Sequence, residues 1–210
     1  MSNCPIVFDF NVTPPPDSAG CVLAGGKSER MGTDKALLDF EGKTFIEHAL
    51  EKLSSFPEVY ISATDAETYS FTGAPVVTDI SQNMGPLCGF ISVLSAVDAQ
   101  YVCFRSVDSP LVPAGLHPLL ASLCQGKDAA IPTYKNQTEP LLACISKSML
   151  PTLMRQAENG HFKIADAFSL RDTVYVHLGD PEMIREFGDP RDYLINANEP
   201  ETLKKIRKRR

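Results

Sequence analysis

The sequence predicts an α/β fold in which a single doubly wound, mostly parallel sheet carries helices on both faces. Short apolar runs, such as those at 21–24 and 101–104, are typical of strands buried on both sides of a parallel sheet. Segments whose apolar residues recur at helical spacing, such as 45–53 and 87–97, separate these runs. A glycine-rich basic loop directly follows the first run. Because open α/β sheets bind ligands outside the carboxyl ends of their strands, this order predicts a binding loop there.

The elements are expected to alternate along the chain, because the period of the apolar residues changes from segment to segment. In the first half we expect a strand at 21–24, an extended piece at 36–40, a turn at 41–43, a helix at 45–53, strands at 59–62 and 75–79, and a helix at 87–97. In the second half we expect strands at 101–104, 128–132, 138–145 and 173–177, helices at 116–123, 149–157 and 161–168, and a last helix capped by Asn198. Strands joined through helices in this order favour a doubly covered parallel sheet.

Residues 1–19 are expected to form an extended lead-in, and residues 20–210 are expected to form one domain. The three prolines at 14–16 favour an extended chain, and residues 5–8 can pair as an extra edge strand. The lead-in has no basic n-region and carries acidic residues, which argues against a secretion signal. No apolar run approaches the roughly 20 residues that span a bilayer. We therefore expect a cytoplasmic protein without a membrane partner.

The composition is that of an ordinary globular domain, with 43% hydrophobic and 22% charged residues. A formal net charge of −6 argues against a nucleic-acid partner, so clusters of basic residues need a local explanation. The six cysteines are scattered, mostly in apolar surroundings, and form no Cys-x-x-Cys pair. They are expected to be small core residues in a reducing compartment rather than metal ligands.

The loop after the first strand gathers the residues expected of an anion site. Gly25 and Gly26 lack a Cβ, which lets backbone N–H groups approach an anion closely. Lys27, Arg30 and Lys35 add three cations within one loop of an acidic chain. A Gly-Gly pair alone often makes only a turn, and neither a P-loop nor a Gly-x-Gly-x-x-Gly fingerprint is present. The cations nevertheless indicate a cradle for a polyphosphate.

Residues 23–38 read Leu-Ala-Gly-Gly-x-Ser-x-Arg-Met-Gly-x-Asp-Lys-x-Leu-Leu. This string resembles the signature loop of the molybdenum cofactor guanylyltransferases, which are nucleotidyltransferases that make molybdopterin guanine dinucleotide. The resemblance covers roughly Gly20 to the C-terminus. The string Gly85-Pro86-Leu87-x-Gly89 also matches the family, and it separates these enzymes from the related molybdopterin cytidylyltransferases. The resemblance thus implies a nucleotidyltransferase fold of the Rossmann-like kind and a preference for guanine.

The resemblance implies transfer of GMP from GTP to the terminal phosphate of molybdenum-molybdopterin, which gives the dinucleotide cofactor and pyrophosphate. It also names molybdoenzyme apoproteins or their chaperones as candidate partners. A phosphate nucleophile is already an anion at neutral pH, so no general base is expected among the four histidines. Two alternatives stay open. One is a related nucleotidyltransferase that uses CTP or a sugar-phosphate acceptor, and the other is a catalytically silent nucleotide-binding protein that delivers cofactor.

Individual roles also follow from the resemblance. Asp108, just beyond the strand at 101–104, is expected to bind magnesium (Mg²⁺) against the triphosphate oxygens. Lys35 and Arg30 are expected to act with Asp108 in catalysis by neutralising charge on the phosphates and on the leaving pyrophosphate. The full set expected to bind the nucleotide is Leu23, Ala24, Gly25, Gly26, Lys35, Asp79 and Asp108.

Two polar residues, Asp79 and Asn198, have both a structural and a functional interpretation. Asp79 ends the strand at 75–79, where a carboxylate often caps a turn or the next helix. The resemblance instead places it in the guanosine site, and a carboxylate can accept both the N1–H and the exocyclic amine of guanine. Asn198 can cap the last helix, and the resemblance makes Asn196 and Asn198 candidates for substrate contact.

Several positions depart from the pattern of the resembled family. Ser62 stands where the family often has an asparagine, and Val107 replaces a smaller residue before the expected metal ligand. Glu139 stands in place of a glutamine or histidine before Pro140, near the expected acceptor site. Arg105 is also unusual. It can add positive charge for phosphates or simply face solvent.

Overall fold

The computed structural model describes residues 8–25, 34–81 and 83–196. Its main sheet contains eight strands: β1 (Ser18–Leu23), β4 (Val59–Ala63), β5 (Val76–Thr78), β6 (Tyr101–Ser106), β7 (Ala129–Tyr134), β8 (Gln137–Thr138), β9 (Cys144–Ser146) and β10 (Thr173–His177). A separate two-stranded ribbon contains β2 (Asp39–Phe40) and β3 (Lys43–Thr44). The helices are α1 (Phe45–Lys52), α2 (Pro86–Ala96), α3 (Leu116–Cys124), α4 (Leu150–Glu158), α5 (Ala165–Phe168), α6 (Pro181–Phe187) and α7 (Pro190–Tyr193). Three short 3₁₀ helices are η1 (Lys35–Leu37), η2 (Glu67–Thr72) and η3 (Lys147–Met149).

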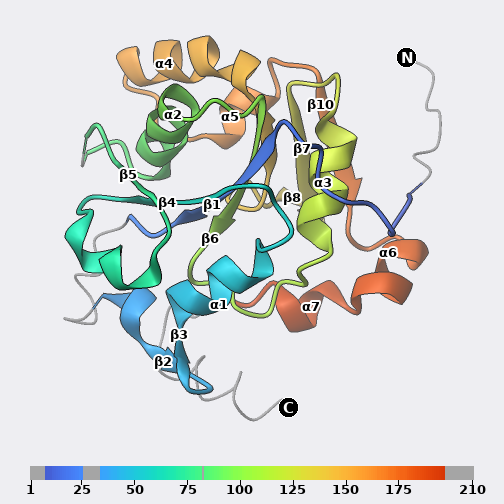
Figure 1. Cartoon of the computed structure of the whole chain (residues 1–210). Helices are drawn as coiled ribbons and strands as arrows, with labels where there is room; N and C mark the ends of the chain where they lie inside the picture. Colours follow the sequence, from blue (N-terminus) through green and yellow to red (C-terminus); the bar gives the residue numbers. More distant parts are fainter. Residues whose placement is uncertain (1–7, 26–33, 82, 197–210) are drawn as a thin grey trace.

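The strand order is β10-β7-β9-β6-β1-β4-β5, and β8 pairs with β7 (Figure 1). Most neighbours are parallel, because β1 pairs in parallel with β4 and β6, β4 with β5, and β10 with β7. Within the main sheet as described, only β8 and β9 run antiparallel to their neighbours. The predicted mostly parallel, doubly wound sheet is therefore confirmed.

The chain reverses its winding direction at β1. It first adds β4 and β5 on one side of β1, and then crosses back to place β6 on the other side. The boundary between β1 and β6 is thus a topological switch point. In open α/β sheets a crevice forms at the carboxyl ends of the strands at such a point. The fold therefore places the expected ligand site where β1 and β6 end.

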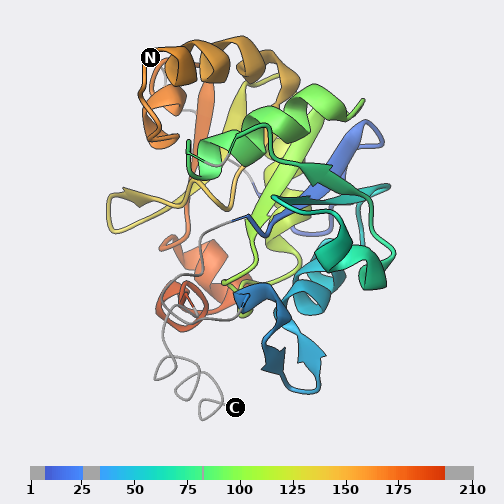
Figure 2. The same ribbon diagram turned by 90° about the vertical axis from the view of Figure 1, so that its left-hand side faces the viewer.

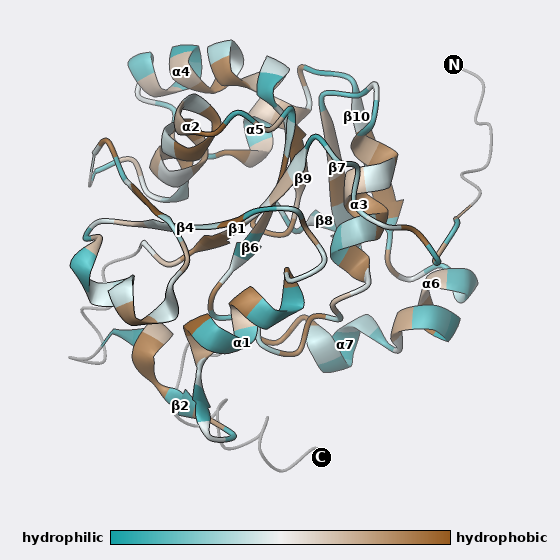
Figure 3. Cartoon of the chain, in the orientation of Figure 1, coloured by the Kyte–Doolittle hydropathy of each residue, from teal (hydrophilic) through white to brown (hydrophobic). Residues whose placement is uncertain are grey.

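Two apolar cores lie on opposite faces of the sheet, because successive strand residues point to opposite sides. Val22 belongs to the core under α1 and α3, whereas Cys21 and Leu23 belong to the core under α2, α4 and α5. The rings of Phe90 on α2 and Phe104 on β6 stack with their centroids 4.1 Å apart. Figures 1 and 2 show α2 and α4 on one side of the sheet and α1 on the other. In Figure 3 the central strands are mostly brown, and the helices carry teal residues.

Some predicted elements need correction. The piece at 36–40 is not wholly extended, because Asp34 accepts a hydrogen bond from the N–H of Ala36 at 3.0 Å and starts the turn of η1. The strand predicted at 138–145 is two short strands, β8 and β9. Pro140 between them has no N–H to continue a ladder, and the N–H of Leu142 turns back to the oxygen of Glu139 at 3.0 Å. The helices α6 and α7 were not predicted.

The other predicted helices and strands of the described chain are confirmed within a few residues. The five described cysteines are buried and free, as expected of core residues. Residues 5–7 of the suggested edge strand and the helix predicted after Asn198 lie outside the described residues. Among the helices that the structure describes, none has the length and hydropathy that a membrane crossing requires.

Candidate active site

Asp79 lies directly against the glycine turn that follows β1. A Cβ atom on Gly25 would lie 2.5 Å from Oδ2 of Asp79, so the absence of a side chain allows this close approach. The hydroxyl of Ser62 donates to the other oxygen, Oδ1, at 2.7 Å. The N–H of Asp79 donates to the oxygen of Ala63 at 2.9 Å, so the backbone continues the β4–β5 pairing. These contacts hold the half-buried carboxylate at the edge of the sheet.

Burial shifts the ionisation of Asp79. It raises the pKa of the carboxyl above its ordinary value, and the hydrogen bond from Ser62 opposes this shift. The position where the resembled family often has an asparagine thus still supplies a hydrogen-bond donor. Ser62 supports the carboxylate in this chain.

The backbone of the glycine turn differs in one respect from the expected anion cradle. The N–H groups of Ala24 and Gly25 both donate to the oxygen of Ser62, at 2.9 Å and 3.1 Å. The turn stays attached to β4 beyond the end of β1, so the amide of Gly25 is already engaged in this structure. The expectation that this N–H faces an anion is therefore corrected, and the contribution of Gly25 here is the space it leaves beside Asp79.

Side chains of α2 hold the loop that follows Asp79. The hydroxyl of Ser92 accepts from the N–H of Ile80 at 3.0 Å, and the sulfur of Cys88 accepts from the N–H of Ser81 at 3.1 Å. Sequence reasoning missed both supports, because Ser92 and Cys88 look like ordinary residues of a buried helix face. Gly85 precedes α2 with φ +56° and ψ −148°, a conformation that glycine adopts readily.

Lys35 stands outside the sheet, at the start of η1. The preceding Asp34 fixes this turn from both carboxylate oxygens, because Oδ1 accepts from the N–H of Ala36 and Oδ2 accepts from the hydroxyl of Tyr69 at 2.6 Å. Tyr69 is buried, and burial raises the pKa of its phenol, with a further contribution from Asp34. No sequence signal connected Tyr69 to this loop, since the two lie far apart in the chain.

Asp108 lies just beyond β6, next to the end of β1. The N–H of Val107 donates to the oxygen of Leu23 at 3.2 Å, which ties the two strand ends together. Oδ1 of Asp108 accepts from the hydroxyl of Ser106 at 2.6 Å, and the hydroxyl of Ser109 lies 3.4 Å away. Oδ2 has no hydrogen-bond donor among the residues that the structure describes.

The chemistry of this carboxylate fits a hard cation. Mg²⁺ is usually bound by one or two carboxylates together with phosphate oxygens and water. Asp108 offers one such oxygen at the switch point of the sheet, and its other oxygen is oriented by a hydroxyl. The residues present therefore suit magnesium held between Asp108 and a polyphosphate.

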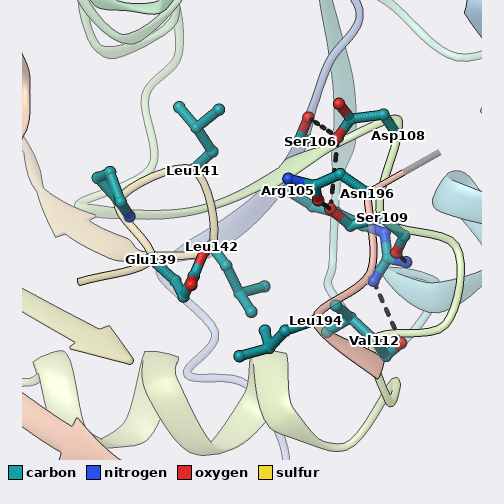
Figure 4. A pocket seen from close by; sticks show the side chains of 11 residues that line it. Arg105, Ser106, Asp108, Ser109, Val112, Glu139, Leu141, Leu142, Leu194 and Asn196 are labelled. Atoms are coloured by element: carbon teal, nitrogen blue, oxygen red, sulfur yellow. Dashed lines mark hydrogen bonds between the residues drawn. The ribbon is translucent and has the colours of Figure 1, made fainter. Parts of the chain in front are cut away.

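A cavity of about 290 Å³ opens beside Asp108 (Figure 4). In Figure 4 Asp108 and Glu139 lie on opposite sides of this space, with Leu194 below. The cavity is lined by Arg105, Ser106, Asp108, Ser109, Val112, Glu139, Pro140, Leu141, Leu142, Leu194 and Asn196. Its floor is thus largely apolar, and carboxylates and an amide stand at its edges.

Glu139 and Asn196 are both brought to this cavity. Burial raises the pKa of the Glu139 carboxyl, which is half-buried. The amide oxygen of Asn196 accepts from the hydroxyl of Ser109 at 2.9 Å, which links the C-terminal part of the described chain to the loop of Asp108. Glu139 and Asn196 thus reach one cavity from segments far apart in the sequence.

Both interpretations of Arg105 were wrong, because its side chain neither faces solvent nor stands free to meet a phosphate. The side chain is 0% exposed, and its guanidinium donates to the backbone oxygens of Ser109 and Val112. The loop after β6 folds over it, which β6 alone does not reveal.

The structure brings Ala24, Gly25, Asp79 and Asp108 to one edge of the sheet, as the strand order predicted. Other candidates lie outside the described residues. These are Gly26, Lys27, Arg30 and Asn198.

Comparisons with known proteins agree with this geometry. Residues 20–174 match the family model of the MobA-like NTP transferase domain. The chain is 34% identical over 201 residues to a probable molybdenum cofactor guanylyltransferase from Methanosarcina mazei, with 88% of each chain covered. It is 30% identical over 187 residues to a probable molybdenum cofactor guanylyltransferase from Carboxydothermus hydrogenoformans, with 89% of this chain and 93% of that relative covered.

A solved structure has a similar fold. The crystal structure of molybdopterin-guanine dinucleotide biosynthesis protein A from Archaeoglobus fulgidus matches with a TM-score of 0.75 at 27% identity, covering 90% of this chain and 96% of that one. Because the family model covers most of the chain and the relatives match along nearly their whole length, the chain belongs to the MobA-like NTP transferase family and is a nucleotidyltransferase.

Proposed function

We propose that the protein transfers GMP from GTP to the terminal phosphate of molybdenum-molybdopterin, giving molybdopterin guanine dinucleotide and pyrophosphate. The names of its relatives support this reaction class. The observation that carries the choice of base is the Asp79 carboxylate, held by Ser62 and lying against Gly25. A carboxylate in this place can accept from the N1–H and the amine of guanine, whereas adenine offers no such pair of donors.

The chemical step needs charge control more than proton transfer. A phosphate oxygen of the acceptor attacks the α-phosphorus of GTP, and the bond from that phosphorus to the bridging oxygen of the β-phosphate breaks as pyrophosphate leaves. The nucleophile is already an anion, so a general base is not required.

Asp108 would hold Mg²⁺, which when bound supplies neutralisation of the triphosphate and of the leaving group. Lys35 and Arg30 neutralise the remaining negative charge on the phosphates and keep the phosphates in line for attack. The cavity between Asp108 and Glu139 supports an acceptor site, because its apolar floor suits a flat ring system and it adjoins the phosphate end of the site.

The test is pyrophosphate release with each of the four nucleoside triphosphates, with and without molybdenum-molybdopterin and Mg²⁺. We expect pyrophosphate release with GTP and with none of the other three nucleotides. This release should occur only when the acceptor and the metal are both present. Lys35→Ala and Asp108→Asn should each lower turnover by about 100-fold or more with the fold intact. Asp166→Asn, an exposed carboxylate on α5, is the matched control.

Each other outcome changes a different part of the proposal. Release with CTP would contradict the guanine site at Asp79. Release without the pterin would contradict the acceptor. Nucleotide binding without any turnover would point to the catalytically silent alternative.

A further inference from the structure

Arg105, on β6, is a buried cation beside the loop that carries Asp108. Its side chain is 0% exposed, and none of the ion pairs of the described residues includes it. Burial lowers the pKa of the guanidinium to about 10, and the nearby Asp108 carboxylate opposes this shift, so the guanidinium stays charged near neutral pH. A buried charge is costly unless hydrogen bonds or other charges compensate it. This arginine therefore needs a structural or functional reason.

The guanidinium of Arg105 forms hydrogen bonds with the loop that carries Asp108. Nη2 donates to the oxygen of Ser109, and Nη1 lies 3.4 Å from the oxygen of Val112 (Figure 4). The two carbonyls belong to residues on the far side of Asp108 from β6, so Arg105 closes the loop back onto the strand. Ser109 also places its hydroxyl near Oδ1 of Asp108 and donates to Asn196.

His117 at the start of α3 completes the arrangement. Nη1 of Arg105 lies 3.3 Å from Nε2 of His117, and Nδ1 of His117 lies 3.2 Å from the oxygen of Ala114. Arginine can only donate, so Nε2 is the acceptor and the ring proton sits on Nδ1. Burial, and then the charge of Arg105, lowers the pKa of His117 to about 3, which keeps the ring neutral. Arg105 thus joins the Asp108 loop to α3 through a neutral histidine of defined tautomer.

We propose that Arg105 and His117 form a positioning unit that holds the loop from Val107 to Val112 so that the Asp108 carboxylate keeps its place at the metal and acceptor site. This inference rests on the proposed role of Asp108. Without the guanidinium, the carbonyls of Ser109 and Val112 lose their shared donor and the loop gains alternative conformations. A small displacement of a positioned group is enough to cost about 100-fold in rate.

The test compares metal binding with folding. Mn²⁺ replaces Mg²⁺ as a paramagnetic probe, and its binding to the full-length protein in the presence of GTP is followed by electron paramagnetic resonance. In Arg105→Met we expect the dissociation constant for Mn²⁺ to rise by about tenfold, which corresponds to about 1.4 kcal/mol. Arg105→Lys keeps the charge but not the forked donor geometry, and it should recover only part of the affinity.

Two further variants separate an effect on Mn²⁺ binding from an effect on folding. Arg171→Met removes another arginine, whose Nη2 lies 2.9 Å from Oδ1 of Asp128. Neither residue of this pair lines the cavity, so this variant should leave Mn²⁺ binding unchanged. If Arg105→Met does not fold, the double variant Arg105→Met/His117→Leu decides, because replacing both buried partners with apolar groups leaves neither unsatisfied. We expect this double variant to fold and still to bind Mn²⁺ weakly.

The outcomes separate this inference from the proposed function. If Asp108→Asn weakens Mn²⁺ binding and the folded Arg105 variants bind as the wild type does, the positioning role is wrong and the proposed metal site stands. If Asp108→Asn itself leaves Mn²⁺ binding unchanged, the proposed metal site is wrong and the inference that rests on it is overturned as well.

Discussion

At the scale of single residues, the missing side chain of Gly25 matters to the candidate site as much as the side chains of Asp79 and Ser62. Gly25 leaves space for Asp79, and Ser62 uses its hydroxyl to hold the carboxylate in that space. Gly25 is exposed and has no positive φ, so its conformation alone does not demand glycine. Its requirement comes from the carboxylate beside it.

Gly25→Ala should therefore impair nucleotide binding more than folding. The new Cβ would lie 2.5 Å from Oδ2 of Asp79 and push the carboxylate away from Ser62. We expect the KM for GTP to rise by about tenfold, equivalent to about 1.4 kcal/mol, with the melting temperature nearly unchanged. Ser62→Ala, which loses the hydrogen bond without a clash, should have a smaller effect. An unchanged KM in Gly25→Ala would contradict the role of Asp79.

His117 should make stability depend on pH. Its pKa is about 3 in the folded protein and near 6.5 when unfolded, so the unfolded state binds the extra proton between these values. Its contribution to stability is complete above the unfolded pKa and falls as the pH decreases from about 6.5 toward 3, by up to about 1.4 kcal/mol per pH unit. Burial raises the pKa values of Asp79 and Glu139, and this acts in the opposite direction.

Urea unfolding of the wild type and of variants at pH 7, 6 and 5 measures the contribution of His117 to the pH dependence of the unfolding free energy. His117→Gln should show a flatter dependence of the unfolding free energy on pH than the wild type. His161→Gln, at an exposed position, is the control and should follow the wild-type curve. Parallel curves for all three proteins would show that His117 does not titrate in this way.

At the scale of elements, α2 is fitted closely to the ends of β1 and β4. A Cβ on Gly89 would lie 2.6 Å from the hydroxyl oxygen of Ser62 and 3.0 Å from Cδ2 of Leu23. Gly85 supplies the unusual turn before the helix. Both glycines of the Gly-Pro-Leu-x-Gly string thus have a structural reason, namely the approach of α2 to the site, and this reason holds whichever base is bound.

Gly89→Ala should destabilise the protein although alanine favours a helix. Overpacking of this kind costs about 1–3 kcal/mol, which exceeds the roughly 1 kcal/mol gained from helix propensity. Chemical denaturation should give a net loss, and the shift of α2 should also disturb Ser62 and hence GTP binding. Ser95→Ala, on the exposed face of the same helix, is the control and should be nearly neutral. A more stable Gly89→Ala protein would mean that α2 moves away without cost.

At the scale of the whole molecule, one sheet serves two cores. Strand residues alternate between the faces, so any loss of packing on one face loosens strands that the other face also needs. Phe45 on α1 and Phe90 on α2 are buried on opposite faces.

Phe45→Ala and Phe90→Ala should each lower the unfolding free energy by about 3–5 kcal/mol. Because both cores share the same strands, we expect one unfolding transition in each variant, with fluorescence and circular dichroism changing together. Two separated transitions in either variant would show that the layers fold independently.

Much of this architecture follows from local patterns in the sequence. Apolar periodicity predicted nearly all helices and strands up to β10, and the positions of Gly25, Asp79 and Asp108 after strands predicted that they meet at one edge. This works because parallel strands end at the same side of a sheet. The helices α6 and α7 have only seven and four residues, too few for an apolar period to stand out. The turn at η1 depends on the side chain of Asp34.

The sequence therefore determined the sheet, its covering helices and the edge at which Gly25, Asp79 and Asp108 meet, since those depend on residues close together in the chain. Tertiary structure alone decided the surroundings of single side chains. Arg105 is buried because the loop ending at Val112 and the helix of His117 close over it. Tyr69 reaches Asp34, and Asn196 reaches Ser109, across long stretches of chain. Such contacts depend on how distant segments pack, and no local period encodes them.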